Sequence, residues 1–191
     1  MSVGLIPLKW TNLLPAFRVA KRIFKRDAMV VFQSYAVSLL PRVLLPREAR
    51  RSLNRMSYFL AFKDNRRIGV TGFYVTKDAP REAWLGWFGI DNEMRSRGLG
   101  KDLLMATIDL ARKEGFNNLR LWSTDNPNLT VVARKLFRMT GMNEEKTSYT
   151  YWGYPVLIYS ISLKVGGPAP YLGSMKNAFF GCIEHFQPRP E

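Results

Sequence analysis

Cysteine and histidine are almost absent from the sequence. It has one cysteine, Cys182, and one histidine, His185, among its 191 residues. A lone cysteine excludes an internal disulfide and argues against a cysteine-based metal site. A Ser-His-Asp triad would have to use His185, close to the C-terminal end, so hydrolysis by such a triad is not expected. We therefore predict that the protein binds no metal ion.

Acidic residues are also scarce relative to basic ones. Lys and Arg number 29 against 15 Asp and Glu, which gives a formal net charge of +14. Such a surface attracts nucleic acid, an acidic membrane or a phosphorylated small molecule, or serves solubility alone, and charge does not choose among these. Hydrophobic residues make up 47% of the chain and charged residues 23%, which indicates a globular protein with a core.

Long hydrophobic runs are missing as well. The uncharged stretch Ala28–Leu40 is too short to span a bilayer and runs into Pro41. Residues 1–10 lack the basic start and long apolar run of a secretory signal. These features predict a soluble, cytoplasmic protein, and peripheral association with a membrane stays open.

The N-terminal part of the chain predicts a short strand, Gly4–Trp10, followed by two helices. Apolar residues recur at helical spacing from Leu13 to Phe24, and a second helix is expected over Ala28–Leu40. The first helix also carries a basic stripe at the same period, made of Arg18, Lys21, Arg22, Lys25 and Arg26. This stripe is either a solvated face or a surface for an acidic partner or a membrane.

Strand patterns begin further along the chain. Ser57–Lys63 and Arg67–Thr76 predict an antiparallel hairpin, and Glu82–Ile90 predicts a third strand. Gly86 and Gly89 inside the third strand indicate a bulge or the close approach of a ligand to the backbone.

The remaining pattern alternates helices and strands. A helix over Gly100–Lys113 connects the third strand to Asn118–Ser123, and a helical crossover predicts that these two strands are parallel. Another helix ends near Met139 and two closing strands follow. Gly and Pro residues after Lys164 indicate a linker, and Gly173–Phe186 predicts a short amphipathic helix. We expect one domain over residues 1–164 and a linker with a tail over residues 165–191.

A basic, glycine-containing turn carries the clearest chemical signal. It reads Arg95-Ser96-Arg97-Gly98-Leu99-Gly100-Lys101 and lies between the third strand and a helix. Glycines allow successive backbone amides to face one concavity at the helix N-terminus, where partial positive charge is focused. Pyrophosphate is a natural ligand for such a turn, and a glycine turn with incidental arginines is the alternative. The turn lacks the features of a P-loop and of the dinucleotide fingerprint.

This turn resembles the Gln/Arg-x-x-Gly-x-Gly/Ala motif of the GNAT superfamily of N-acetyltransferases. Lys113–Phe116 resembles the end of the helix that follows the motif in that family, and Ala133–Met142 is similar to its Ala-x-x-Leu-Tyr-x-x-x-Gly-Phe helix. The resemblance spans about Ser57–Leu163. The first 56 residues fit only by their strand-helix-helix order, and the tail after Lys164 is unmatched.

The resemblance implies a three-layer α+β sandwich with a mixed, mostly antiparallel sheet. Its central parallel strands, Glu82–Ile90 and Asn118–Ser123, would splay apart and hold acetyl-CoA. Family members bind pyrophosphate and the pantetheine arm at positions that correspond here to Phe88, Ile90, Arg95, Ser96, Arg97, Gly98, Leu99, Gly100, Lys101 and Asn126. The backbone of Phe88 and Ile90 would pair with the pantetheine arm, and Asn126 would touch the same arm.

Two departures from the family pattern concern catalysis. Phe137 stands where many members have a tyrosine that protonates the leaving thiolate. The common glutamate of the first splayed strand falls at Trp84, so Glu82, two residues earlier on the same face, is the candidate general base. The alternative for Glu82 is a solvated residue at a strand end. The remaining candidate acids are water, Tyr149, Tyr151 and Tyr154.

The predicted function is therefore an N-acetyltransferase that moves an acetyl group from acetyl-CoA to an amine by direct attack in a ternary complex. Phe137 favours a second hypothesis, a non-catalytic acyl-CoA binding module. The stripe Arg18–Arg26 favours a third, a basic nucleic-acid or membrane-surface protein on the same fold. Candidate partners are acetyl-CoA, an unidentified amine acceptor, an anionic partner at the basic helix and a second copy of the chain.

Overall fold

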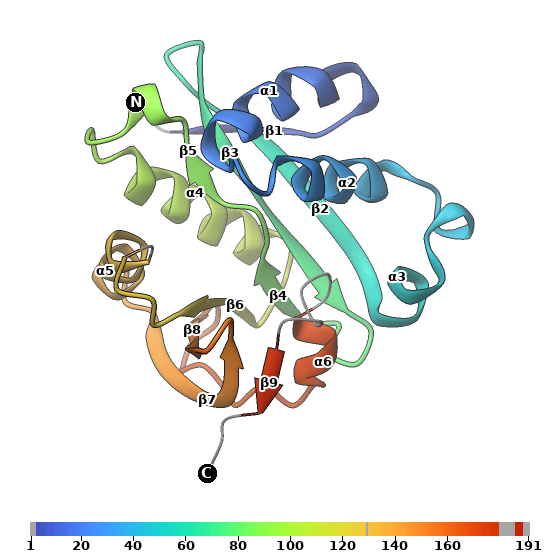
Figure 1. Cartoon of the computed structure of the whole chain (residues 1–191), viewed down its shortest axis with the longest axis vertical. Helices are drawn as coiled ribbons and strands as arrows, with labels where there is room; N and C mark the ends of the chain where they lie inside the picture. The colour runs from blue at the N-terminus through green and yellow to red at the C-terminus, as the bar shows by residue number, and fades with distance from the viewer. Residues whose placement is uncertain (1–2, 129, 180–185, 189–191) are drawn as a thin grey trace.

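A computed structural model describes residues 3–128, 130–179 and 186–188 and places nine strands in one sheet (Figure 1). The order is β1-β2-β3-β4-β6-β8-β7-β9, with β5 beside β3. The strands are β1 (Gly4–Pro7), β2 (Leu53–Lys63), β3 (Arg66–Thr76), β4 (Glu82–Leu85), β5 (Gly89–Ile90), β6 (Asn118–Thr124), β7 (Asn143–Tyr151), β8 (Tyr154–Ser162) and β9 (Phe186–Pro188). β4 and β6 run parallel while the other described pairs are antiparallel, which confirms the expected mixed sheet.

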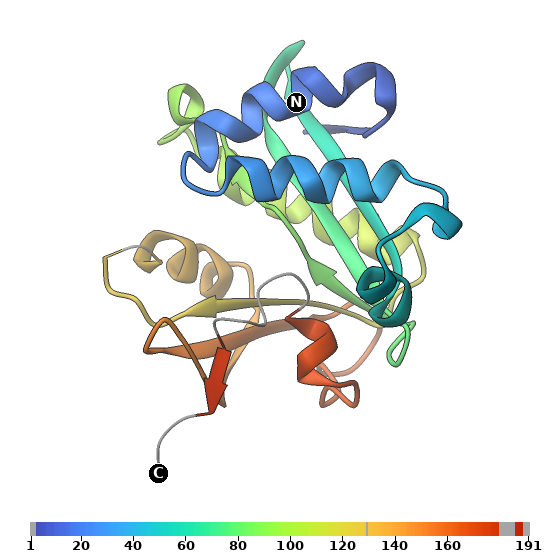
Figure 2. The ribbon, with the colours of Figure 1, turned by 45° about the vertical axis from the view of Figure 1, so that its right-hand side comes forward.

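Helices cover both faces of the sheet (Figure 2). α1 (Leu13–Ile23) and α2 (Ala28–Leu39) lie on one face, and α4 (Leu99–Lys113) and α5 (Val131–Met139) pack on the other. The shorter helical segments are η1 (Trp10–Asn12), η2 (Arg42–Leu44), α3 (Arg47–Ser52), η3 (Asn92–Met94) and α6 (Met175–Ala178). The three-layer α+β sandwich is thereby confirmed. None of the described helices is long and apolar enough to cross a membrane.

The sheet has a hydrophobic core on each face, and side chains along the β2–β3 hairpin alternate between these two cores. Phe59 and Phe73 pack in the core under α4, whereas Tyr58 and Leu60 pack under α1 and α2. The strand β2 begins at Leu53, four residues before the expected start, because Leu53 is buried and pairs with β3 across an irregular register.

The central parallel strands diverge after three residue pairs. β4 and β6 are paired from Glu82 with Asn118 to Trp84 with Arg120. Beyond that point β6 continues to Thr124 with hydrogen-bonded partners on β8 alone. The splay that the family resemblance implied is therefore present.

A β-bulge turns the first central strand away from β6. Leu85 lies opposite Phe73, and Gly89 lies opposite Val70, so the three residues between Leu85 and Gly89 face only two residues of β3. The amide of Gly86 within the bulge still donates to the carbonyl of β3 residue Gly72, at 2.9 Å. The bulge predicted from the two glycines is confirmed, and it separates β5 from β4.

The C-terminal segment folds back onto the sheet. The ring of Tyr171 meets Trp84 edge-on, with ring centroids 5.0 Å apart, and the hydroxyl of Tyr74 donates to the carbonyl of Ala178. The C-terminal helix is shorter than expected: α6 covers only residues 175–178, residues 180–185, including Cys182 and His185, lie outside the described part, and residues 186–188 form β9. The division at residue 164 stays a prediction, although residues 169–179 contact the sheet.

Candidate functional site

The basic glycine turn joins η3 to α4. Gly98 has φ +73°, in the left-handed region, and Ser96, two residues earlier, has φ +63°. A Cβ added to Gly98 would meet no atom within 4 Å. Gly98 is therefore required for its backbone angle, whereas the surrounding space is open to a ligand.

The N-terminus of α4 presents unpartnered backbone amides. No side chain caps this helix, and the amides of residues 97–100 have no hydrogen-bond acceptor among the described residues. The amides of Lys101 and Asp102 bond back to the carbonyl of Gly98, at 3.0 and 3.3 Å. Free N–H groups at the positive end of a helix dipole form an anion site, so the turn fits a pyrophosphate group.

The charged side chains of the turn fall into two groups. Arg95 folds back, and its Nε donates to the carbonyl of Ile90 at 3.3 Å. Arg97 and Lys101 are exposed and form no ion pair with any residue the structure describes. The nearby carboxylate of Asp102 is paired with the Nζ atom of Lys63, at 2.9 Å. The turn therefore keeps a positive field for an anion.

The strand β5 offers its backbone to the space left by β6. The amide of Asp91 donates to the carbonyl of Ile68 on β3, at 2.9 Å. Neighbouring residues of an antiparallel strand point their backbone groups alternately toward and away from the partner, so the groups of Ile90 point away from β3. The carbonyl of Ile90 already accepts the Nε of Arg95, and its amide is the group left to pair. Phe88 lies two residues earlier, within the bulge. Pairing of these two residues with a pantetheine arm stays a prediction.

Asn126 shapes the loop between β6 and α5. Its Oδ1 accepts the amide of Asn128 at 2.9 Å, and its carbonyl accepts the hydroxyl of Thr130 at 2.8 Å. A Cβ built on Gly100 would lie 3.5 Å from a methyl group of Leu136, so α5 packs beside the start of α4. Contact between Asn126 and a cofactor stays a prediction.

Glu82 is the first residue of β4, at the end of the strand where β4 and β6 are paired. Its Oε2 accepts the Nε of Arg120 at 2.7 Å, and its Oε1 accepts the Nδ2 of Asn118 at 2.9 Å. The Arg120 side chain is only 2% exposed and also donates to Ser160 and to the carbonyl of Ala169. Both oxygens of Glu82 are thus engaged within the fold, and its role as a base stays a prediction.

Hydrocarbon or indole rings stand at the two positions where many family members have a glutamate and a tyrosine. Trp84 is fully buried, stacked near Tyr74 at 6.5 Å and covered by Tyr171. Phe137 is also buried and packs against Tyr159, with ring centroids 5.1 Å apart. No ionisable side chain stands at either position.

Tyr159 is a polar group beside Phe137 that sequence reasoning missed. Its hydroxyl donates to Glu144 at 2.7 Å and accepts the Nε of Arg134 at 3.3 Å. Burial, together with the hydrogen bond to the Glu144 carboxylate, raises the pKa of Tyr159 to about 12. Tyr159 is therefore protonated at neutral pH. Tyr159 lies in the continuous apolar run of β8, where residues 156–160 are all buried, and no local signal pairs it with Glu144.

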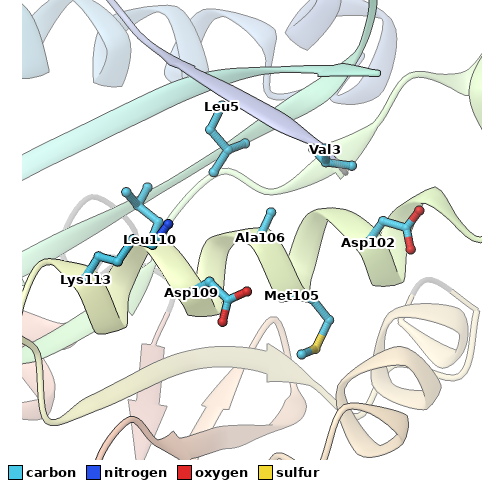
Figure 3. Close-up of a pocket in the computed structure, with 8 residues that line it drawn as sticks. All are labelled: Val3, Leu5, Asp102, Met105, Ala106, Asp109, Leu110 and Lys113. Atoms are coloured by element: carbon cyan, nitrogen blue, oxygen red, sulfur yellow. The ribbon is translucent and has the colours of Figure 1, made fainter. Parts of the chain in front are cut away.

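A hollow of about 550 Å³ lies elsewhere, between the edge strand β1 and α4 (Figure 3). Leu5 of β1 and Val3, which precedes that strand, line it on one side, and Met105 and Leu110 line it from α4. It is separate from the place where β4 and β6 diverge, so it is not part of the candidate cofactor site. Among the described residues, no three His, Cys, Asp or Glu side chains gather as a metal-binding group.

Known proteins resemble this chain in sequence and in fold. The model of the "Acetyltransferase (GNAT) family" matches residues 21–142. Probable N-acetyltransferase camello from Xenopus tropicalis is 22% identical over 169 residues, covering 85% of this chain and 69% of that protein. A putative GNAT-family acetyltransferase from Desulfovibrio desulfuricans has a similar fold, with a TM-score of 0.66, 16% identity and coverage of 85% of this chain and 100% of that one. A ribosomal L7/L12 alpha-N-protein acetyltransferase in complex with coenzyme A gives a TM-score of 0.62 at 12% identity, with coverage of 85% and 94%.

Proposed function

Because the chain belongs to the Acetyltransferase (GNAT) family, we propose that it transfers an acetyl group from acetyl-CoA to the amino group of an acceptor. The observation that carries this proposal is the divergence of β4 from β6 beside the uncapped amides of α4. The amides of residues 97–100, with Arg97 and Lys101, bind the diphosphate. The backbone of Phe88 and Ile90 pairs with the pantetheine arm, so the thioester reaches the point where the strands part.

The chemistry requires little from ionisable side chains. The amine nitrogen attacks the thioester carbonyl, a C–N bond forms, the C–S bond breaks, and one proton moves from the amine to the departing thiolate. A strand amide donates to the carbonyl oxygen as negative charge develops there, and holding both reactants in place supplies much of the acceleration. An acid or base adds about 10²–10⁴-fold.

Turnover separates this proposal from its nearest alternative. We expect thiol release from acetyl-CoA in the presence of one or more members of a primary-amine panel, with mass spectrometry identifying the acetylated product. The buried ring of Phe137 favours the alternative, a non-catalytic acyl-CoA binding module. Thermal stabilisation by coenzyme A with no turnover on any amine would support that module, and the absence of both would remove the proposed site.

Phe137→Tyr tests the missing acid. We expect turnover to be retained or raised, because the added hydroxyl supplies a proton donor at the position that many family members use. Thiol release at saturating acetyl-CoA measures the effect, and a melting curve checks the fold. A large loss of turnover would mean that the ring packs against Tyr159 in an orientation that cannot serve the thiolate.

Glu82→Gln tests the candidate base. Because both carboxylate oxygens are held by Arg120 and Asn118, we expect a lower melting temperature and less than about a tenfold change in kcat. A general base would instead lose about 10²–10⁴-fold in kcat, with a pH profile that loses its acidic limb. That second result, at an unchanged melting temperature, would establish Glu82 as the base.

A further inference from the structure

Apolar side chains are exposed on the helical layer that covers one face of the sheet. Five of them are not aromatic and come from three neighbouring elements: Leu14 (62%), Met29 (62%), Val30 (43%), Val43 (77%) and Leu44 (63%). The aromatic Trp10, just before α1, is 58% exposed. Scattered single apolar residues on a surface are ordinary, but a group of them on one face indicates a binding surface.

The architecture brings these residues to the same side of the molecule. α1 and α2 lie side by side on the sheet, with the rings of Phe17 and Phe32 4.9 Å apart, and η2 follows directly after α2 (Figure 2). Ala16 and Val31 are buried against the strands below. The opposite sides of both helices therefore face outward together. We call this outer side of α1, α2, η2 and α3 the helical face.

Cations surround the apolar side chains of the helical face. Within residues 3–56, 11 Lys and Arg stand against 2 Asp and Glu, which gives +9 of the chain's net +14. Arg22 and Arg55 are paired with Asp91 and Glu114. The other cations of this segment are exposed and form no ion pair within the described residues: Lys9, Arg18, Lys21, Lys25, Arg26, Arg42, Arg47, Arg50 and Arg51.

We propose that the helical face binds an anionic membrane surface peripherally. Lys and Arg are attracted to acidic lipid headgroups, and aliphatic side chains between them enter the boundary between headgroups and acyl chains. A single-stranded nucleic acid would match the charge, but it gains affinity from aromatic stacking platforms, whereas the exposed apolar residues here are aliphatic apart from Trp10. Val43 and Leu44, on the short helical turn η2 beside Arg42, are the most exposed of these aliphatic side chains.

This surface lies next to the candidate cofactor turn. Arg22 near the end of α1 holds the buried carboxylate of Asp91, and Asn92 donates to the carbonyl of Arg22 at 2.8 Å. These residues lead directly into the basic glycine turn. Docking through the helical face therefore keeps the cofactor turn close to the bilayer, although binding itself does not depend on acetyl transfer.

Flotation of the full-length protein with vesicles tests the proposal. We expect it to float with phosphatidylcholine vesicles that contain phosphatidylserine, to stay unbound with phosphatidylcholine alone, and to be released by salt. Replacing Arg18, Lys21 and Lys25 with Gln should weaken binding about fivefold per cation, or about 100-fold together. Val43→Ser with Leu44→Ser should weaken it about tenfold without any change in charge.

A matched control variant distinguishes the effect of where the removed cations lie from the effect of the lower net charge on vesicle binding. Lys113, Lys135 and Lys146 are exposed lysines on α4, α5 and β7, and replacing all three with Gln makes the same charge change away from the helical face. We expect this triple variant to float like the unaltered protein, with melting curves matched for all variants. Equal loss in both triple variants, or RNA binding that exceeds vesicle binding and ignores the Val43/Leu44 change, would overturn the proposal.

Discussion

Gly98→Asp is expected to abolish coenzyme A binding while the protein stays folded. Gly98 stands at the start of α4 with φ +73° and open space around its Cα. A carboxylate placed there faces the diphosphate with like charge, and at about 4 Å two such charges repel by about 4 kcal/mol near a protein surface. Isothermal titration calorimetry should therefore show a loss on the order of 100-fold or more in affinity.

Gly98→Asn is the matched control for this change. Asn and Asp tolerate the left-handed region similarly and have nearly the same shape, so both carry a similar backbone cost of about 1 kcal/mol. We expect the Asn variant to lose less than about tenfold in affinity, which isolates the charge as the cause. Equal losses in the two variants would point to backbone strain, and unchanged binding in both would remove the pyrophosphate assignment.

Arg120→Ala is expected to destabilise the protein by about 3–5 kcal/mol. Arg120 is buried, and its guanidinium joins Glu82, Ser160 and the carbonyl of Ala169. Truncation leaves the Glu82 carboxylate without its cationic partner and opens a cavity between β4 and β8. For a chain of this size, thermal unfolding should shift down by about 10 °C or more.

An exposed pair provides the comparison for Arg120. Arg112 and Asp109 form an ion pair at 2.6 Å on the outer side of α4, and both side chains are about half exposed to solvent. Arg112→Ala should change stability by only about 0.5 kcal/mol, since water and salt screen such a pair. A shift in Arg120→Ala as small as that of Arg112→Ala would mean that Arg120 is not essential to the packing.

The part of the fold nearest the candidate site was predictable because its signals are local. The glycine turn, the helix that follows it and the strand Asn118–Ser123 each depend on a short stretch of sequence with a clear period. The two glycines of the third strand likewise indicated a bulge or the close approach of a ligand, and a bulge is present there. Backbone requirements of this kind can be inferred from the residue type at a single position.

Contacts between distant parts of the chain were not predictable. No short sequence pattern predicts the hydrogen bond between Glu82 and Arg120, which are 38 residues apart. The same holds for Tyr74 and Ala178, which are 104 residues apart. The pattern at Glu82 is that of an exposed strand end, yet a buried guanidinium holds it. In the sequence Tyr159 is likewise an ordinary strand residue, and only the fold brings it to Glu144 and Arg134. Such pairs depend on strand order, which single-sequence patterns leave undetermined.

The C-terminal segment is synthesised last, although it completes part of the core. Tyr171 and Ala178 complete the packing around Trp84 and Tyr74, and they leave the ribosome after β1 to β8 have all been made. During synthesis the indole of Trp84 lacks this cover, so the nascent sheet displays an apolar patch that chaperones or neighbouring chains can bind. Shortened versions that stop after β8 would keep that patch for their whole lifetime.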